Sequence, residues 1–289
     1  MNLHAKEKAA MVKHLIREAR HSSSGWSRAN CPFCPSLLGK VDRKQALAIN
    51  MGNGCFVCFR CGTTGRMRDD EYQRQEVAPD TAAFSMDAPE GYLALCEEPA
   101  RSAMSAAPAR QYLRSRKLTQ ESIWAEAKIG ACLSGRYDGR VIVPVLSSDY
   151  AWVGWVGRVW FKQADRAYSY PRGMKRGDIL YNHAALLRET DTPVIVVEGV
   201  FDALAYWPDA VAVLGKPSDT QVYALASARR PVAVVLDGDA WQEGEVLAMK
   251  LRLEGQRAGS VKLGPRIDPD EVEHGWLRTR AVECLEESL

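Results

Sequence analysis

The sequence lacks any apolar run long enough to cross a membrane. No window approaches the ~18 uninterrupted apolar residues that a membrane-spanning helix needs. Residues 1–20 carry charged side chains throughout, in place of the apolar core of a signal peptide. Internal repeats and low-complexity tracts are also absent. These absences argue against a membrane partner and predict a cytoplasmic protein, and a hydrophobic content of 46% suffices for a buried core.

The cysteines are too unevenly placed for a disulfide framework. Five of the eight lie between Cys31 and Cys61, and the other three are scattered singly. Disulfide frameworks are typical of short secreted chains, whereas clustered cysteines in a reducing compartment favour a metal site.

Two Cys-x-x-Cys knuckles predict one structural zinc ion. Cys31 and Cys34 form the first knuckle, and Cys58 and Cys61 form the second, 23 residues further on. Zn²⁺ prefers four ligands in a tetrahedron, and each knuckle supplies two thiolates. Cys55 offers an alternative because Cys55-x-x-Cys58 is also a knuckle; we expect Cys55 to be a spare thiol.

The segment that holds the knuckles is basic. Residues 1–68 contain twelve Lys or Arg and three Asp or Glu, and aromatic residues are interleaved with the cations near the knuckles. Cations contact phosphates and exposed aromatic rings stack on unpaired bases, so the pattern favours a nucleic-acid partner. Ordinary surface charge and a small aromatic core are the alternative.

The chain divides into four segments. Residues 1–68 hold a short basic helix and the cysteine knuckles, and the charged, proline-containing residues 69–90 predict a linker. Residues 91–190 predict two short helices followed by an antiparallel hairpin. The expected helices span 108–117 and 119–127, and the expected strands span 140–146 and 151–160.

Residues 191–289 predict a parallel sheet. Short apolar runs alternate here with helix-compatible stretches, which is the pattern of buried parallel strands joined by helices. The runs lie at 194–197, 211–214, 232–236 and 260–263, and the helical stretches at 201–206, 220–229 and 244–254.

Acidic residues follow three of these strands. Glu198 comes directly after the first run, Asp237 and Asp239 follow the third, and Asp268 and Asp270 follow the fourth. The carboxyl ends of parallel strands share one edge, where ligands bind. Carboxylates crowded there raise one another's pKa, and a divalent cation such as Mg²⁺ compensates their charge. The sequence therefore predicts a catalytic Mg²⁺ or Mn²⁺ site suited to phosphoryl transfer.

Several motifs resemble those of DnaG-like DNA primases. VVEGVFDAL at 196–204, DGD at 237–239 and DPDE at 268–271 resemble the signatures of the Toprim fold. Residues 111–123 and 138–158 resemble the motifs that open the primase catalytic core, and the knuckles resemble the primase zinc ribbon. The resemblance implies an α/β Toprim-type catalytic domain preceded by a mixed α+β subdomain and a small N-terminal β zinc ribbon.

The resemblance also implies an activity and residue roles. The expected activity is synthesis of short RNA primers on single-stranded DNA from ribonucleoside triphosphates. Glu198, Asp237 and Asp239 would hold Mg²⁺, and Asp268 and Asp270 would add a second ion or a water shell. The residues expected to contact nucleotides or template are Arg158, Lys162 and Lys175, with ordinary surface charge as the alternative for each. Asp202, one helical turn beyond Glu198, is expected to support the site.

The chain departs from the family pattern in two places. All four expected zinc ligands are cysteines, whereas cellular primases often have a histidine among them. Residues 240–244 stand where a small Ala-Gly pair usually opens the next helix, which leaves the start of that helix open. No helicase domain follows, so we expect a phage or mobile-element protein of the host cytoplasm or nucleoid that works with a separate replicative helicase.

Other functions stay open. A Toprim nuclease would use the same metals to cut phosphodiesters, although the motifs ahead of the Toprim segment favour a primase. A non-catalytic recombination mediator with zinc and Toprim modules would not need the acids that this chain has. A topoisomerase fits least, because the length leaves no room for a gate domain.

Overall fold

The structure is a computed structural model that describes residues 11–12, 14–15, 20–21, 26–50, 54–66, 86–147, 149–161 and 166–286. Contacts divide the chain into two compact units, Met1–Asp80 with Leu253–Gly255 and Thr81–Arg252 with Gln256–Leu289. Most of the predicted N-terminal helix and residues 69–85 of the predicted linker lie outside the described residues. The predicted domain boundaries therefore stay predictions.

The first unit is built on an antiparallel sheet of five strands in the order β1-β2-β3-β4-β5. The strands are β1 (Arg20–His21), β2 (Trp26–Ala29), β3 (Leu47–Asn50), β4 (Cys55–Cys58) and β5 (Thr64–Arg66). A short helix, α2 (Cys34–Leu38), begins at the first knuckle and ends at Gly39, whose φ of 65° suits glycine. Buried Phe33, Leu47 and Phe56 belong to the small core of this unit.

The second unit begins with an antiparallel sheet of five strands in the order β10-β9-β8-β7-β6. The strands are β6 (Tyr92–Ala94), β7 (Gly130–Cys132), β8 (Arg140–Leu146), β9 (Trp152–Val159) and β10 (Tyr168–Ser169). The helical elements between β6 and β8 are η2 (Met104–Ala106), α3 (Ala107–Ser115), α4 (Glu121–Glu126) and η3 (Gly135–Tyr137). The two predicted helices and the predicted hairpin, β8 with β9, are confirmed.

A parallel sheet of four strands follows in the order β12-β11-β13-β14. The strands are β11 (Val194–Val197), β12 (Ala210–Ala212), β13 (Val232–Val234) and β14 (Ala258–Ser260). The helices are α5 (Val200–Ala205), α6 (Asp219–Ala226), α7 (Trp241–Leu253) and α8 (His274–Glu286). Short 3₁₀ turns are η4 (Arg176–Asp178), η5 (His183–Leu187) and η6 (Pro269–Glu271). The predicted parallel arrangement is confirmed, and the open start of the helix after Asp239 falls at Trp241.

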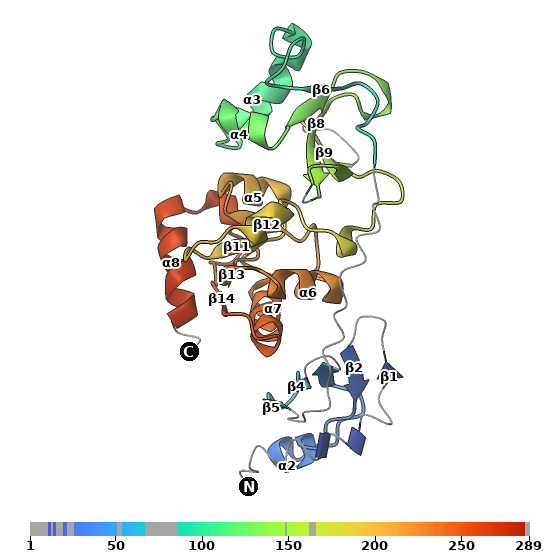
Figure 1. The fold of residues 1–289 in the computed structure, drawn as a ribbon, viewed down its shortest axis with the longest axis vertical. Helices are drawn as coiled ribbons and strands as arrows, with labels where there is room; N and C mark the ends of the chain where they lie inside the picture. The colour runs from blue at the N-terminus through green and yellow to red at the C-terminus, as the bar shows by residue number, and fades with distance from the viewer. Residues whose placement is uncertain are drawn as a thin grey trace. The chain divides into compact units, whose positions relative to one another are not determined.

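Helices cover both faces of the parallel sheet (Figure 1). Ile195 and Val197 of β11 belong to the same buried cluster as core residues of α5 and α8. Val194 and Val196 belong to the cluster that includes α6 and α7. Because successive side chains of a strand point to opposite faces, burial on both sides requires an uninterrupted apolar strand such as VIVV. None of the described helices is both long and apolar enough to span a membrane.

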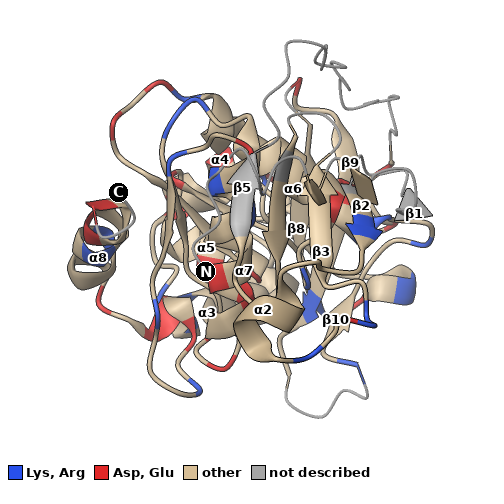
Figure 2. Cartoon of the chain, turned by 90° about the horizontal axis from the view of Figure 1, so that it is seen from below, with Lys and Arg blue, Asp and Glu red and all other residues tan. Residues whose placement is uncertain are grey.

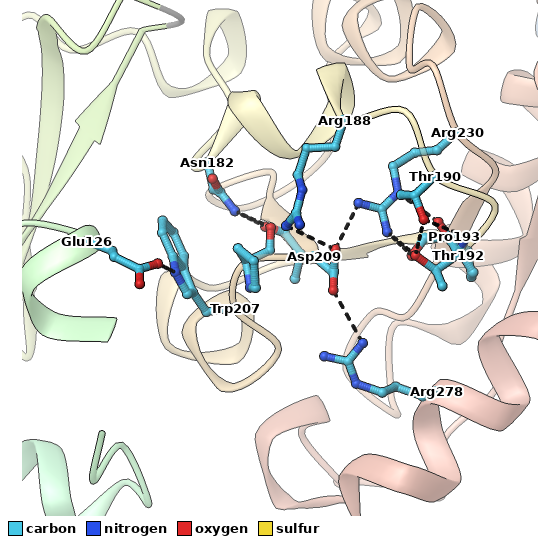
Figure 3. Close-up of polar contacts among 12 residues, drawn as sticks. Glu126, Asn182, Arg188, Thr190, Thr192, Pro193, Trp207, Asp209, Arg230 and Arg278 are labelled. Atoms are coloured by element: carbon cyan, nitrogen blue, oxygen red, sulfur yellow. Dashed lines mark hydrogen bonds and ion pairs between the residues drawn. The ribbon is translucent and has the colours of Figure 1, made fainter. Parts of the chain in front are cut away.

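One carboxylate links the amino-terminal ends of three neighbouring strands (Figure 3). Asp209, just before β12, accepts a 2.9 Å hydrogen bond from Arg230, which lies just before β13 and whose side chain is fully buried. Arg230 also donates to the carbonyl oxygen of Thr192 at 2.7 Å, close to the start of β11. Arg188 and Arg278 contact the same carboxylate at 3.3 and 3.4 Å. This network lies at the amino-terminal ends of the strands, whereas the predicted acids lie at the carboxyl-terminal ends.

Candidate metal centre and active site

The four knuckle cysteines meet at one point of the first unit. The sulfur atoms of Cys31, Cys34, Cys58 and Cys61 all lie within 4.8 Å of one another. The Cys31–Cys61 and Cys34–Cys58 sulfur distances are 3.6 and 3.7 Å. Four sulfurs bound tetrahedrally at ~2.3 Å from one ion would lie about 3.8 Å apart. The cluster therefore fits a zinc ribbon and contains the four cysteines expected from the two knuckles. The Cys55 side chain lies outside the described part of the chain, so its role stays a prediction.

Asp42 supports the first knuckle, and the sequence analysis missed it. Its buried carboxylate accepts hydrogen bonds from the backbone N–H groups of Cys31 at 2.9 Å, Lys44 at 2.9 Å and Ala46 at 2.7 Å. Burial alone would raise the pKa of Asp42, but these three donors and the nearby Arg60 guanidinium outweigh it, and the pKa is lowered. A single Asp in a basic segment gives no sequence signal that it lies behind a cysteine ligand.

The predicted acids lie at a topological switch point of the parallel sheet. β11 and β13 are neighbours, but the chain leaving β11 enters α5 on one face and the chain leaving β13 enters α7 on the other. Such divergence opens a crevice outside the carboxyl ends of the strands, where α/β proteins bind ligands. Glu198 directly follows β11, and Asp237 lies three residues beyond β13.

A glycine holds two of the acid-bearing loops together. Gly238, between Asp237 and Asp239, donates its N–H to the carbonyl oxygen of Ile267 at 3.0 Å. A Cβ atom at Gly238 would collide with the carbonyl oxygen of Gly264. The DGD loop can therefore approach the segment leading to Asp268 only because its central residue has no side chain.

The five predicted acids interact electrostatically with one another. Burial, followed by the negative charges of Asp237 and Asp239, raises the pKa of Glu198 to about 7, and Asp268 adds to the shift. Burial, followed by Asp268, Asp239 and Asp270, raises the pKa of Asp237 to about 6. The structure thus brings Glu198, Asp237, Asp239, Asp268 and Asp270 to one site, where burial and neighbouring negative charges raise the pKa of Glu198, Asp237 and Asp268.

Two further acids belong to this site. Burial, followed by the charges of Asp270 and Asp237, raises the pKa of Asp202 to about 7. Glu243, in the first turn of α7, adds to the negative charge that acts on Glu198. Figure 2, in which Asp and Glu are red, shows acidic residues on the ribbon near α5 and α7. Asp202 was expected beside the site, whereas Glu243 was not, because its only signal in the sequence is an acid early in the helix after DGD.

Two oxygens of the acid cluster have no hydrogen-bond partner among the described residues. They are Oδ1 of Asp237 and Oδ1 of Asp270, and both are buried. A buried polar atom without a partner is costly, and carboxylate oxygens are the ligands that hard divalent cations prefer. The chemistry of these donors suits a divalent cation, although among the described residues only the four cysteines already have three or more ligand atoms within 4.8 Å of one another.

Arg116 reaches the acids from the C-terminal end of α3. Its Nη2 lies 2.6 Å from Oδ2 of Asp270, and its guanidinium carbon lies 5.5 Å from the centre of the Phe201 ring. This ion pair offsets part of the repulsion among the carboxylates. Arg116 lies inside the 111–123 motif, but nothing local in the sequence names Asp270, 154 positions away, as its partner.

The predicted nucleotide-binding and template-binding cations have different surroundings. Arg158, on β9, donates its Nε–H to the hydroxyl of Tyr112 at 3.2 Å and lies over the ring of Tyr168 at 4.5 Å. Lys175 is exposed. Lys162 lies outside the described residues.

Arg176, which the sequence analysis missed, reaches the carboxyl edge of the sheet. Its guanidinium donates to the carbonyl oxygen of Leu214, just beyond β12, at 3.4 Å and lies 4.6 Å from the centre of the Tyr170 ring. The N–H of Leu214 in turn donates to the carbonyl oxygen of Glu198 at 2.9 Å. Arg176, next to Lys175 in sequence and likewise exposed, is therefore a cation at the carboxyl edge of the sheet.

No protein-family model and no curated protein sequence matches this chain. Solved structures do match it. The zinc-binding and RNA polymerase domains of the Aquifex aeolicus primase match with a TM-score of 0.54 and 18% identity, over 99% of this chain and 86% of that chain. The RNA polymerase domain of the Mycobacterium tuberculosis primase DnaG, in complex with double-stranded DNA, matches with a TM-score of 0.52 and 20% identity, over 68% and 78%. A DnaG primase catalytic domain bound to single-stranded DNA matches with a TM-score of 0.51 and 22% identity, over 63% and 75%.

The TM-scores of these three matches, 0.51 to 0.54, show a common fold despite the low sequence identities. The likeness extends through both the four-cysteine unit and the unit that carries the acids, in agreement with the resemblance found in the sequence. The chain has the fold of the zinc-binding and RNA polymerase domains of DnaG primases.

Proposed function

We propose that this protein is a DNA primase that synthesises short RNA primers on single-stranded DNA by divalent-metal-dependent nucleotidyl transfer. The observation that carries the proposal is the acid cluster at the switch point of the parallel sheet, on a fold shared with DnaG primases. Oδ1 of Asp237 and Oδ1 of Asp270 are buried there with no hydrogen-bond partner among the described residues. The pKa values of Glu198 and Asp237 are raised to about 7 and about 6, so the ionised carboxylates are destabilised. A bound cation would relieve this repulsion.

The acids would divide into two groups around the metal. Glu198, Asp237 and Asp239 would hold one Mg²⁺ or Mn²⁺ ion, and Asp268 and Asp270 would hold a second ion or its water shell. When bound, such ions neutralise the charge of a triphosphate and favour ionisation of the attacking hydroxyl. On this assignment the parallel sheet with its acids is a Toprim-type domain.

The other residues of the site would supply position and positive charge. Arg116 would keep Asp270 oriented through their 2.6 Å ion pair. Arg158 and Arg176, each packed on a tyrosine ring, would contact phosphates of the nucleotide or template. Lys162 and Lys175 keep the same proposed role.

The first unit would present the template to these acids. The zinc-held ribbon contains exposed cations such as Arg28, which lies over the ring of Phe59 at 4.9 Å. Cation–aromatic surfaces of this kind suit unpaired bases and their phosphates. We further propose that the protein works with a separate replicative helicase and comes from a phage or mobile element.

A primer-synthesis assay tests the function. Zinc-loaded protein, single-stranded DNA of mixed sequence, four labelled ribonucleoside triphosphates and Mg²⁺ are expected to give short RNAs. Glu198→Ala and Asp237→Ala should lower the yield at least about a hundredfold, because charge stabilisation in the transition state is lost. Glu189→Ala is the matched control, since its exposed side chain pairs with Arg229 away from the site.

Other products would point elsewhere. Loss of DNA strands without new RNA would replace the primase with a nuclease that uses the same acids. DNA binding without any reaction, with Mg²⁺ or Mn²⁺ and with helicase present, would favour a non-catalytic recombination mediator.

A further inference from the structure

A groove of about 340 Å³ lies between α6 and α7. Its apolar lining comes from Pro217, Val222, Val246 and Leu247. Val222 and Leu247 are core residues with exposed fractions of 0% and 2%, whereas Val246 is 36% exposed. Buried core side chains therefore form the bottom of the groove, and the partly exposed side chain of Val246 lies at its side.

One end of this groove adjoins the acid cluster. Glu243 and Gln242, at the start of α7, line it, and the charge of Glu243 contributes to the raised pKa of Glu198. Lys216 also lines it and lies two residues beyond Leu214, whose N–H bonds to the carbonyl oxygen of Glu198. Two sides of the groove are thus linked to Glu198, one through the charge of Glu243 and the other through the backbone of Leu214.

An ion pair borders the groove further along α7. Lys250 lines the groove and lies 2.8 Å from the carboxylate of Asp219, in the first turn of α6. Lys250 is seven residues beyond Glu243 on the same helix, a distance of about 10 Å at 1.5 Å per residue. The groove therefore runs from the acids along α7 for about the length of a nucleoside.

Lys216 is placed to receive negative charge at the acid end. No ion pair joins it to an acid anywhere in the described part of the chain, whereas Lys250 is already paired. An ammonium group in the groove that Glu243 also lines suits a ligand that brings phosphates to the acids.

We propose that this groove binds the nucleoside part of a ribonucleoside triphosphate, with Lys216 contacting its phosphates. The inference rests on the proposed primase function and adds a nucleotide subsite to it. Small-molecule sites measure about 300–1,000 Å³, are lined mainly by apolar groups with a few polar ones, and lie at switch points of α/β sheets. The groove has a volume at the lower end of this range, combines an apolar surface with four polar or charged residues, and adjoins the switch point at Glu243. A base can lie against the valine and leucine side chains while its phosphates extend toward Lys216 and the acids.

Val246→Phe tests the subsite by filling the groove at a partly exposed position. The matched control is Val282→Phe on α8, where the valine is 46% exposed and lies outside the groove. With single-stranded DNA saturating, Val246→Phe should raise the KM for ribonucleoside triphosphates about tenfold and leave kcat within about twofold. Val282→Phe should match the wild type. Lys216→Ala should also raise this KM, and Lys216→Arg should restore most of it.

Equilibrium binding of labelled ATP and GTP to the full chain with Mg²⁺, without template, gives a second readout. Binding should weaken about tenfold in Val246→Phe and not in Val282→Phe. The two proposals fail separately. Primer synthesis with the same nucleotide KM and the same binding in all variants would overturn the subsite and leave the primase standing. Absence of primer synthesis would overturn the primase, and the binding measurement would still decide the subsite. A change in the KM for DNA alone would assign the groove to template and overturn the proposal.

Discussion

Asp42 contacts a zinc-ligand backbone directly, so its effect can be measured through the metal. In Asp42→Asn an NH₂ group replaces one acceptor oxygen and faces either the N–H donors of Cys31 and Ala46, which share Oδ2, or that of Lys44, which uses Oδ1. We expect zinc affinity to fall about 10–100-fold, as for other groups that orient metal ligands. Competition with a chromophoric chelator measures this. Lys40→Gln, at an exposed position of the same unit, is the control, and equal affinities would show that Asp42 does not support the site.

The raised pKa values of the acid cluster predict how stability depends on pH. Glu198 goes from an ordinary pKa of 4.5 to about 7, and Asp237 from 3.8 to about 6. The folded chain therefore binds protons at a higher pH than the unfolded chain, and stability falls as pH rises through this window. Without added Mg²⁺, zinc-loaded protein should have a higher Tm at pH 5.5 than at pH 8 from these groups.

A substitution and an added ion separate this effect from other titrations. Glu198→Gln should flatten the pH dependence of the Tm, because its side chain does not ionise. Mg²⁺ at pH 8 should raise the Tm of the wild type more than that of Glu198→Gln. If the Tm of the wild type changed between pH 5.5 and pH 8 in the same way as the Tm of Glu198→Gln, the raised pKa values of the cluster would be contradicted.

At the scale of elements, the Asp209 network predicts a large loss of stability. Asp209→Ala leaves the fully buried Arg230 side chain without its carboxylate at the point where three strands begin. Removing one partner of a buried ion pair costs about 3–5 kcal/mol. Denaturant unfolding followed by tryptophan fluorescence measures the change in the free energy of unfolding.

The control for this prediction is another ion pair at the same edge of the sheet. Arg229 and Glu189 are both exposed, with side-chain fractions of 59% and 77%. Glu189→Ala should therefore change the free energy of unfolding by less than about 1 kcal/mol. If Asp209→Ala and Glu189→Ala lowered the free energy of unfolding equally, burial of Arg230 would not determine the loss of stability.

At the scale of the whole molecule, zinc removal should affect the two units differently. The first unit has a small core in which Cys31, Cys34 and Cys58 are themselves members, so its folding depends on the metal. The two large buried clusters of the second unit consist of residues from Leu95 onward. Chelation should make residues 26–66 sensitive to protease while residues 91–286 stay resistant. Cleavage at the same rate in both ranges would contradict this prediction.

Features whose cause is local can be predicted from the amino-acid sequence. The two Cys-x-x-Cys motifs predict a four-cysteine cluster, because the short loop within each motif holds its two cysteines close together. Uninterrupted apolar strands such as 194–197 required helices on both faces, and acids directly after such strands could only lie at the carboxyl edge. The placement of Glu198 and Asp237 follows from that rule, whereas Asp268, eight residues beyond β14, also depends on the contact between Gly238 and Ile267.

Which residues far apart in the sequence become partners depends on how the helices, strands and loops pack. Arg116 pairs with Asp270 across 154 positions, and Arg176 rather than Lys175 is held at the end of β12. Asp42, Glu243 and the groove beside Lys216 likewise depend on how separate elements pack. A charged residue has the same local pattern whether it faces solvent or a partner, because its partner is chosen by chain packing and burial and not by its neighbours in sequence.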